Sequence, residues 1–141
     1  MIRITKQADY GILFLTHLAA APVGQVFTCR DLAAGFRVSA PMVSKVLKQL
    51  ARGGVLESHR GIKGGYSLAR APEHISVADI IAAQDGPIAI TECAGQEESD
   101  CRTEPYCSIA GHWQRINEAI LGALRDISLA EMTAGNTAVR V

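Results

Sequence analysis

The sequence contains few of the features that mark a secreted or membrane protein. Only four of its 141 residues are cysteine. No apolar run approaches the length of a membrane span, and the N-terminal residues MIRITKQADYG lack the apolar core of a signal peptide. We therefore expect a cytoplasmic protein with no membrane partner, in a compartment that keeps thiols reduced. A hydrophobic content of 48% is sufficient for one compact domain with a core.

Sequence motifs of enzymes are also missing. The chain has no glycine-rich nucleotide loop and no oxyanion motif. Cys107 and His112 could serve as nucleophile and base, but no third residue is placed to orient the histidine. The sequence therefore predicts that the protein is not an enzyme.

Neither sign of charge is in excess over the whole chain, which has 14 basic and 14 acidic residues and a net charge of zero. Zero net charge by itself argues against a nucleic-acid partner, but the charges are unevenly distributed. Residues 30–63 contain seven Lys or Arg and two acidic residues, whereas residues 92–107 contain five acidic residues and one Arg. We expect the basic and acidic regions to be separated in space.

Three of the cysteines follow one another closely, as Cys93-x7-Cys101-x5-Cys107. The segment that contains them is acidic and has few apolar residues, so it cannot form core. In a reducing compartment, such a cluster indicates a metal or iron–sulfur site, or a redox switch, more than a disulfide framework. An inert loop is the remaining alternative. Cys29 lies far upstream in a short predicted helix, and we expect it to be a structural thiol.

Apolar spacing and capping residues predict most of the secondary structure. Helices are expected over residues 6–21, 29–36, 39–52 and 77–84, with Thr28, Ser39 and Ser76 as N-caps of the last three. Strands over residues 55–59 and 66–69 flank a glycine-rich hairpin tip, RGIKGG. A long amphipathic helix is expected over residues 108–132, with an apolar stripe of Trp113, Ile116, Ile120, Leu124, Ile127 and Leu129.

This order of elements predicts a mainly α fold with a small β-hairpin wing, which is a winged helix-turn-helix followed by a long C-terminal helix. We expect four parts: a DNA-binding domain over 1–75, a short helix and cysteine loop over 76–107, a dimerisation helix over 108–132 and a flexible tail over 133–141. A helix of this length cannot bury its whole apolar stripe on so small a domain. We therefore expect a homodimer, which would place two recognition helices on a pseudo-palindromic operator in double-stranded DNA.

The candidate DNA-contacting residues lie on the helix over 39–52 and on the hairpin. That helix has one apolar face for the core and one basic face that suits a major groove. Candidate base contacts come from Ser39, Met42 and Ser44, and candidate phosphate contacts from Lys45, Lys48 and Arg52. The hairpin supplies Arg60, Lys63, Gly64 and Gly65, with arginine suited to a minor groove and glycine allowing a close approach to phosphates. An ordinary hairpin turn and a plain amphipathic helix are the structural alternative.

Three segments resemble the BadM/IscR/NsrR family of bacterial winged-helix regulators. They are ITKQADYG, SAPMVSKVLKQLARGGVLESHRGIKGGYSLA and the three-cysteine loop before a long helix. The resemblance implies a dimeric transcription regulator, and many members bind an iron–sulfur cluster, [2Fe-2S] or [4Fe-4S]. The segments ITEC and HWQRINEAILGAL are most similar to the subgroup that regulates iron–sulfur assembly (SUF) operons. The resemblance thus implies a regulator, such as a repressor, whose operator affinity depends on a cluster.

The resemblance also implies Cys93, Cys101 and Cys107 as iron ligands, and their spacing lacks the paired knuckles that structural zinc sites favour. Three thiolates leave one iron in need of a fourth ligand. Asp9 from the partner subunit matches a family position that supplies an aspartate in some nitric-oxide-responsive members. His112 is the alternative, although it follows the last cysteine by five residues where related proteins have three. A nitric-oxide-responsive repressor and a zinc- or thiol-dependent regulator therefore remain alternative functions.

Overall fold

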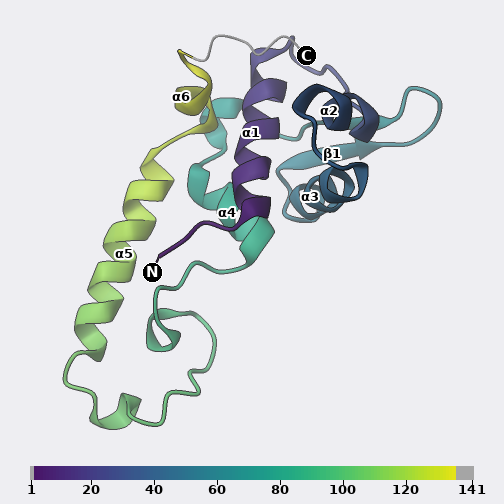
Figure 1. Ribbon diagram of the computed structural model, residues 1–141. Coiled ribbons are helices and arrows are strands. Elements are labelled where there is room, and N and C mark those ends of the chain that lie inside the picture. Colours follow the sequence, from purple (N-terminus) through teal and green to yellow (C-terminus); the bar gives the residue numbers. More distant parts are fainter. Residues whose placement is uncertain (1, 136–141) are drawn as a thin grey trace.

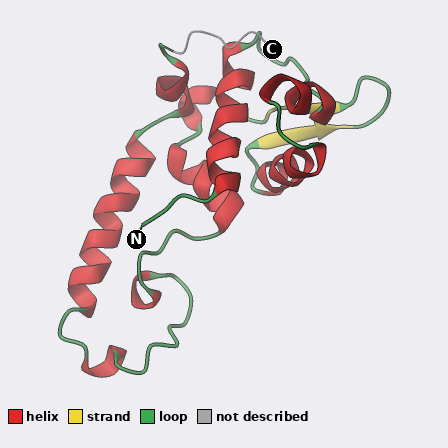
Figure 2. Ribbon diagram, in the orientation of Figure 1, coloured by secondary structure: helices red, strands yellow, loops and turns green. Residues whose placement is uncertain are grey.

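The computed structural model describes residues 2–135, which form a mainly helical body with a short β-hairpin (Figures 1 and 2). The elements are α1 (Lys6–Ala20), α2 (Cys29–Phe36), α3 (Ala40–Arg52), β1 (Leu56–His59), β2 (Gly65–Leu68), η1 (Pro72–His74), α4 (Val77–Asp85), η2 (Glu92–Ala94), η3 (Glu104–Tyr106), α5 (Ala110–Asp126) and α6 (Leu129–Thr133). This arrangement confirms the predicted fold class. The tail expected over 133–141 lies outside the described residues from 136 onward. Within residues 2–135, no helix combines the length and apolarity that a membrane crossing requires.

The predicted helix starts at Thr28 and Ser76 are confirmed by reciprocal capping boxes. The Thr28 hydroxyl accepts a hydrogen bond from the Asp31 N–H at 3.1 Å, and the Asp31 carboxylate accepts one from the Thr28 N–H at 3.1 Å. Ser76 and Asp79 make the same pair of bonds at the start of α4. Each box satisfies two backbone donors that the first helical turn leaves unpaired.

Ser39 was also expected to cap its helix, and this prediction is wrong for the side chain. The Ser39 hydroxyl makes no capping hydrogen bond at the start of α3. A capping oxygen accepts from the second or third N–H of a helix, and the second residue of α3 is Pro41, which has no N–H. Ser39 is exposed, so its hydroxyl is available to other partners.

One apolar core joins the winged-helix elements to two elements that follow them. Its fully buried members include Phe14 of α1, Leu32 of α2, Leu47 of α3, Ile80 of α4 and Leu129 of α6. Burying side chains of this size stabilises the fold by about 1.5–3 kcal/mol each. The predicted winged-helix segment therefore shares its core with α4 and α6.

The β-hairpin is antiparallel, and two of its glycines, Gly64 and Gly65, are required by the protein's own backbone. Leu56 pairs with Leu68 at one end of the hairpin, and His59 pairs with Gly65 at the other. A Cβ on Gly64 would lie 2.6 Å from the His59 carbonyl oxygen. Gly65 has φ of 151°, and a Cβ there would collide with the carbonyl of Phe27. Both glycines are thus required by close approaches within the protein, at the hairpin itself and at the segment that contains Phe27, while their expected approach to phosphate stays a prediction.

The prediction of a single helix over residues 108–132 is wrong, because this segment forms two helices, α5 and α6, with a break between them. Ile127 adopts extended backbone, with φ of −94° and ψ of 115°. Ser128 then starts α6 with a capping box: its hydroxyl accepts from the Glu131 N–H at 3.1 Å, and the Glu131 carboxylate accepts from the Ser128 N–H at 2.9 Å. The new helix start turns Leu129 away from the α5 stripe and into the core.

The chain segments that precede α4 and α6 pair with each other. The Val77 N–H donates to the Ile127 carbonyl at 2.9 Å, and the Leu129 N–H donates to the Ile75 carbonyl at 2.7 Å. Residues 77–127, which we call the arm, therefore begin and end side by side, with α4 at the start of the arm packed on the core and the rest of the arm outside it. Figure 1 shows the cysteine loop and α5 extending away from the rest of the molecule.

We expect Leu129→Ala to lower the free energy of unfolding by about 2–5 kcal/mol, because it removes a fully buried side chain and leaves a cavity. Urea unfolding of the metal-free protein, followed by circular dichroism, measures the change. Val23→Ala is the control, since that side chain is fully exposed and its truncation should change stability little. Equal stabilities of the two variants would contradict the placement of Leu129 in the core.

Candidate DNA-contacting face and cysteine loop

Helix α3 has one buried face and one exposed face, as its sequence predicts. Its buried face carries four fully buried aliphatic side chains, Val43, Val46, Leu47 and Leu50. Lys45, Lys48 and Arg52 are exposed. Three cations on a helix whose opposite face is anchored in the core form a rigid basic surface suited to phosphate.

The three candidate base contacts differ in their exposure. Ser39 is exposed and Ser44 is half-buried. Met42 is half-buried and packs against the apolar core, which limits how far its side chain can extend outward. Of the three, Ser39 has the most accessible side chain, while the assignment of all three to DNA remains a prediction.

The hairpin tip is exposed and carries no internal ion pair. Arg60 and Lys63 are exposed, and Ile62 between them is fully exposed. In the part of the chain that the structure describes, the two salt bridges join Arg70 to Asp79 and Arg125 to Glu118. The cations of the tip and of α3 are therefore not neutralised by acidic side chains of the same chain, which leaves them available to an anionic partner.

Cys29 is the first residue of α2 and contacts the start of α3, as expected of a structural thiol. Its Sγ donates to the Ala40 carbonyl at 3.4 Å and its side chain packs against the core. Burial raises the pKa of the Cys29 thiol, and the nearby Lys48 cation opposes that shift. A thiol with a raised pKa is a poor nucleophile and metal ligand at neutral pH.

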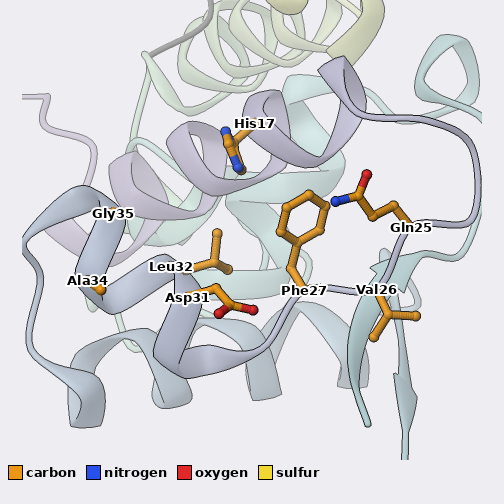
Figure 3. A pocket seen from close by; sticks show the side chains of 8 residues that line it. All are labelled: His17, Gln25, Val26, Phe27, Asp31, Leu32, Ala34 and Gly35. Atoms are coloured by element: carbon orange, nitrogen blue, oxygen red, sulfur yellow. The ribbon is translucent and has the colours of Figure 1, made fainter. Parts of the chain in front are cut away.

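A groove between α1 and α2 lies on the winged-helix body, away from the cysteine loop (Figures 1 and 3). The His17 ring lies edge-on to Phe27 with centroids 5.1 Å apart, and burial lowers the pKa of this histidine. Hydrogen bonds from Thr28 lower the pKa of Asp31, whose carboxylate belongs to the capping box. The His17 ring and the Asp31 carboxylate of this groove therefore already have structural roles.

The three loop cysteines are reduced, half-exposed and distributed along the loop. Cys93 lies in η2 with its Sγ 3.4 Å from the Thr91 hydroxyl, and Cys101 Sγ lies 3.2 Å from the Thr103 hydroxyl. Cys107 follows η3 directly. Across residues 2–135, no three Cys, His, Asp or Glu side chains lie close enough together to hold a metal ion. The thiol donor chemistry nevertheless fits iron–sulfur iron.

The two candidates for a fourth ligand are both accessible but belong to different helices. Asp9 is exposed in the first turn of α1, and His112 is exposed in the first turn of α5. The described chain brings neither of them into a metal-binding group with the cysteines. An exposed Asp9 is free to meet a second subunit, so its predicted role across a dimer stays open to test.

Two polar links join the end of α4, just before the loop, to the winged-helix elements. The Gln84 side-chain amide donates to the Val46 carbonyl of α3 at 2.9 Å, in a buried position. The Thr5 hydroxyl, at the N-cap of α1, donates to the Asp85 carboxylate at 2.6 Å. The first part of the arm is therefore in direct contact with both α1 and α3.

Sequence reasoning missed the residue that holds the start of the cysteine loop. Asn117 is the buried polar residue of α5, and its side chain bonds to backbone groups of residues 88–94. The available signal was an amide in the middle of an apolar stripe, on the same helical face as Trp113 and Leu124. Gln84 was missed in the same way, as a polar side chain at the end of an apolar helix.

Comparison with known proteins agrees with these features. Residues 4–135 match the Rrf2 family, described as iron-dependent transcriptional regulators. The regulator NsrR of Halalkalibacterium halodurans is 26% identical over 131 residues, covering 93% of this chain and 90% of the relative. The structure of CymR, the global cysteine regulator of B. subtilis, superposes with a TM-score of 0.73 at 24% identity, covering 96% of this chain and 99% of CymR.

A second solved structure, T. potens IscR, gives a TM-score of 0.62 at 26% identity, covering 93% of this chain and 85% of that protein. These relatives are transcription regulators and not enzymes, as the sequence predicts for this chain. The family model spans nearly all of the described residues, from α1 through the wing and the cysteine loop to α6. The chain therefore belongs to the Rrf2 family of winged-helix transcription regulators.

Proposed function

We propose that the protein is a DNA-binding repressor whose operator affinity is controlled by an iron–sulfur cluster bound to Cys93, Cys101 and Cys107. One observation carries the proposal: a basic α3 and wing without internal ion pairs occur in the same chain as three reduced thiols on a loop outside the core. The family description as iron-dependent regulators supports iron as the metal. The regulated genes would include those for iron–sulfur cluster assembly (SUF).

The thiols of the loop suit such a cluster in number and accessibility. Each is half-exposed, and the sulfur contacts that Cys93 and Cys101 make are weak ones to threonine hydroxyls. A bound cluster, [2Fe-2S] or [4Fe-4S], would supply a group that responds to oxidants, nitric oxide and iron supply. The partner subunit's Asp9 or His112 would complete the ligand set. Nitric oxide is the alternative signal, which the similarity to a regulator named NsrR supports.

A thiol-based switch without iron is a second candidate. The observation that favours it is the separation of the three thiols in the described loop, where no metal-binding group is formed. In this case two loop thiols would lose two electrons and two protons to an oxidant and form a disulfide. Iron and sulfide analysis of anaerobically purified protein, with its visible spectrum, separates this candidate and a colourless zinc site from a cluster.

Dimerisation would give the cluster a route to DNA affinity. The apolar stripe of α5 remains partly exposed: Ile116 is 44% exposed and Ile109, just before the helix, is 50% exposed. A second copy of α5 would cover these side chains and would set the spacing of two α3 helices on a pseudo-palindromic operator. Because the cysteine loop leads directly into α5, ligation at the loop would act on the relation between the two subunits.

We expect Lys45→Ala to weaken binding to specific and non-specific DNA alike and to reduce the slope of log affinity against log salt by about one unit. Arg60→Ala should instead weaken binding unequally among operators that differ in minor-groove width. Fluorescence anisotropy at several salt concentrations measures both effects. Arg115→Ala is the control, because it removes an exposed cation from α5. Unchanged affinity and slope in Lys45→Ala would show that α3 does not face DNA.

We expect single replacement of Cys93, Cys101 or Cys107 by Ala to lower bound iron and to remove or alter the visible absorption of anaerobically purified protein. Cys29→Ala should retain the iron of the wild type, because this thiol serves the contact between α2 and α3. Iron and acid-labile sulfide assays measure the outcome. A loop cysteine whose replacement leaves iron content complete is not a ligand.

We expect Asp9→Ala to leave the protein dimeric, to shorten the lifetime of the cluster and to reduce the difference in DNA affinity between cluster-loaded and cluster-free protein. Couplings of this kind are about 1–3 kcal/mol, or roughly 5–150-fold in affinity. Asp126→Ala, an exposed acidic residue at the end of α5, is the control. If Asp9→Ala behaves as the wild type and His112→Ala shows these losses, the fourth ligand is His112.

A further inference from the structure

The Asn117 side chain is a buried amide that bonds to the start of the cysteine loop. It is 3% exposed and is the buried residue of α5 within the described chain. Its Oδ1 accepts from the Ile90 N–H at 3.0 Å, and its Nδ2 donates to the carbonyls of Ile88 and Ala94, each at 3.4 Å. Both amide protons and the carbonyl oxygen are used, so this side chain satisfies backbone groups that would otherwise be buried without partners.

The segment that Asn117 holds includes Cys93. Ala94, which accepts from Asn117, is the next residue, and both belong to η2, which packs on α5. At the other end of the segment, Ile88 packs against a buried cluster that contains Ala8 of α1 and Ile81 of α4. The Cys93 backbone is therefore fixed with respect to α5 on one side and, through residues 88–90, to the winged-helix body on the other.

The Cys101 segment has a different environment. The Cys101 N–H donates to the Ser99 hydroxyl at 3.1 Å, and its Sγ meets Thr103. Among residues 2–135, the hydrogen bonds that the structure gives for residues 96–106 join groups of the loop itself, such as the Glu104 N–H and the Cys101 carbonyl at 3.1 Å. Local bonds of this kind leave a segment free to move as a unit relative to the helices.

We propose that Asn117 is the positioning residue of the loop, which holds Cys93 as the fixed thiol while Cys101 is the thiol that moves. The inference rests on the proposed function in so far as these thiols bind a cluster. On cluster binding, the Cys101 segment would then adjust its position relative to a fixed Cys93. Cluster loss releases Cys101 and leaves Cys93 in place, so the position of Cys93 relative to α4 and α5 does not depend on the cluster.

Thiol alkylation of the reduced, iron-free protein tests the positioning role without any cluster. Under nitrogen, iodoacetamide labelling of each cysteine is followed by mass spectrometry of peptides. Cys101 should react faster than Cys93 in the wild type. Asn117→Leu removes all three hydrogen bonds and should raise the Cys93 rate by about tenfold or more, because the side chain then no longer holds the segment on α5. Cys29 should stay within about twofold, as an internal control that the winged-helix core is unchanged.

Two further variants separate positioning from a general loss of stability. Asn117→Asp keeps the acceptor for Ile90 but places a carboxylate oxygen, which cannot donate, against the carbonyls of Ile88 and Ala94, so its Cys93 rate should also exceed that of the wild type. If Asn117→Leu does not fold, Asn117→Asp takes its place in the alkylation test. Gln114→Leu makes the same kind of change at an exposed position on α5 and should behave as the wild type.

Protein that carries the iron–sulfur cluster gives a second measurement of the positioning role. Folded Asn117 variants should form a cluster with an altered visible circular dichroism spectrum and a shorter lifetime against a chelator, whereas Gln114→Leu should match the wild type. Unchanged Cys93 alkylation in folded Asn117→Leu, or a Cys93 that already reacts as fast as Cys101 in the wild type, overturns the proposal. If the wild type binds no iron, the proposed cluster function fails, while the alkylation rates still decide whether Asn117 positions Cys93.

Discussion

The paired backbone hydrogen bonds between the segments before α4 and α6 are the constraint on which the architecture depends. Val77 and Ile127 lie fifty residues apart in the sequence, and their hydrogen bond closes the arm on itself. Two helices start beside this bond, each with a serine N-cap and an acidic residue that completes a capping box. Because the arm begins and ends side by side, it can extend outward while Ile80 and Leu129, near its two ends, remain buried with the winged-helix elements.

The arm is connected to the winged-helix body by polar contacts as well as by apolar packing. Gln84 bonds to the backbone of α3, Thr5 bonds to Asp85, and Asn117 holds the segment that follows. The buried Gln84 side chain therefore joins the helix that precedes the cysteine loop directly to the helix that carries the basic face.

Local signals in the sequence predicted most of the fold, because capping residues and apolar spacing act over a few neighbouring residues. Thr28 and Ser76 were predicted as caps and form them. Ser128 with Glu131 has the same pattern, but the apolar stripe of the preceding helix runs on to Leu129 and masked the break. The role of Asn117 could not be predicted, since it depends on backbone groups 23–29 residues away. The cysteines could be predicted as a candidate site but not their separation, which is a property of the loop conformation.

The separation of charge along the molecule has a consequence for how it meets DNA. The basic α3 and wing lie at one end of the molecule, and the acidic cysteine loop extends at the other (Figure 1). This separation gives a chain of zero net charge an electric dipole moment. In the field of a polyanion such a molecule experiences a torque but little net attraction at long range. It would rotate so that its basic end approaches first and its loop points to solvent, which favours productive encounters without strong non-specific retention.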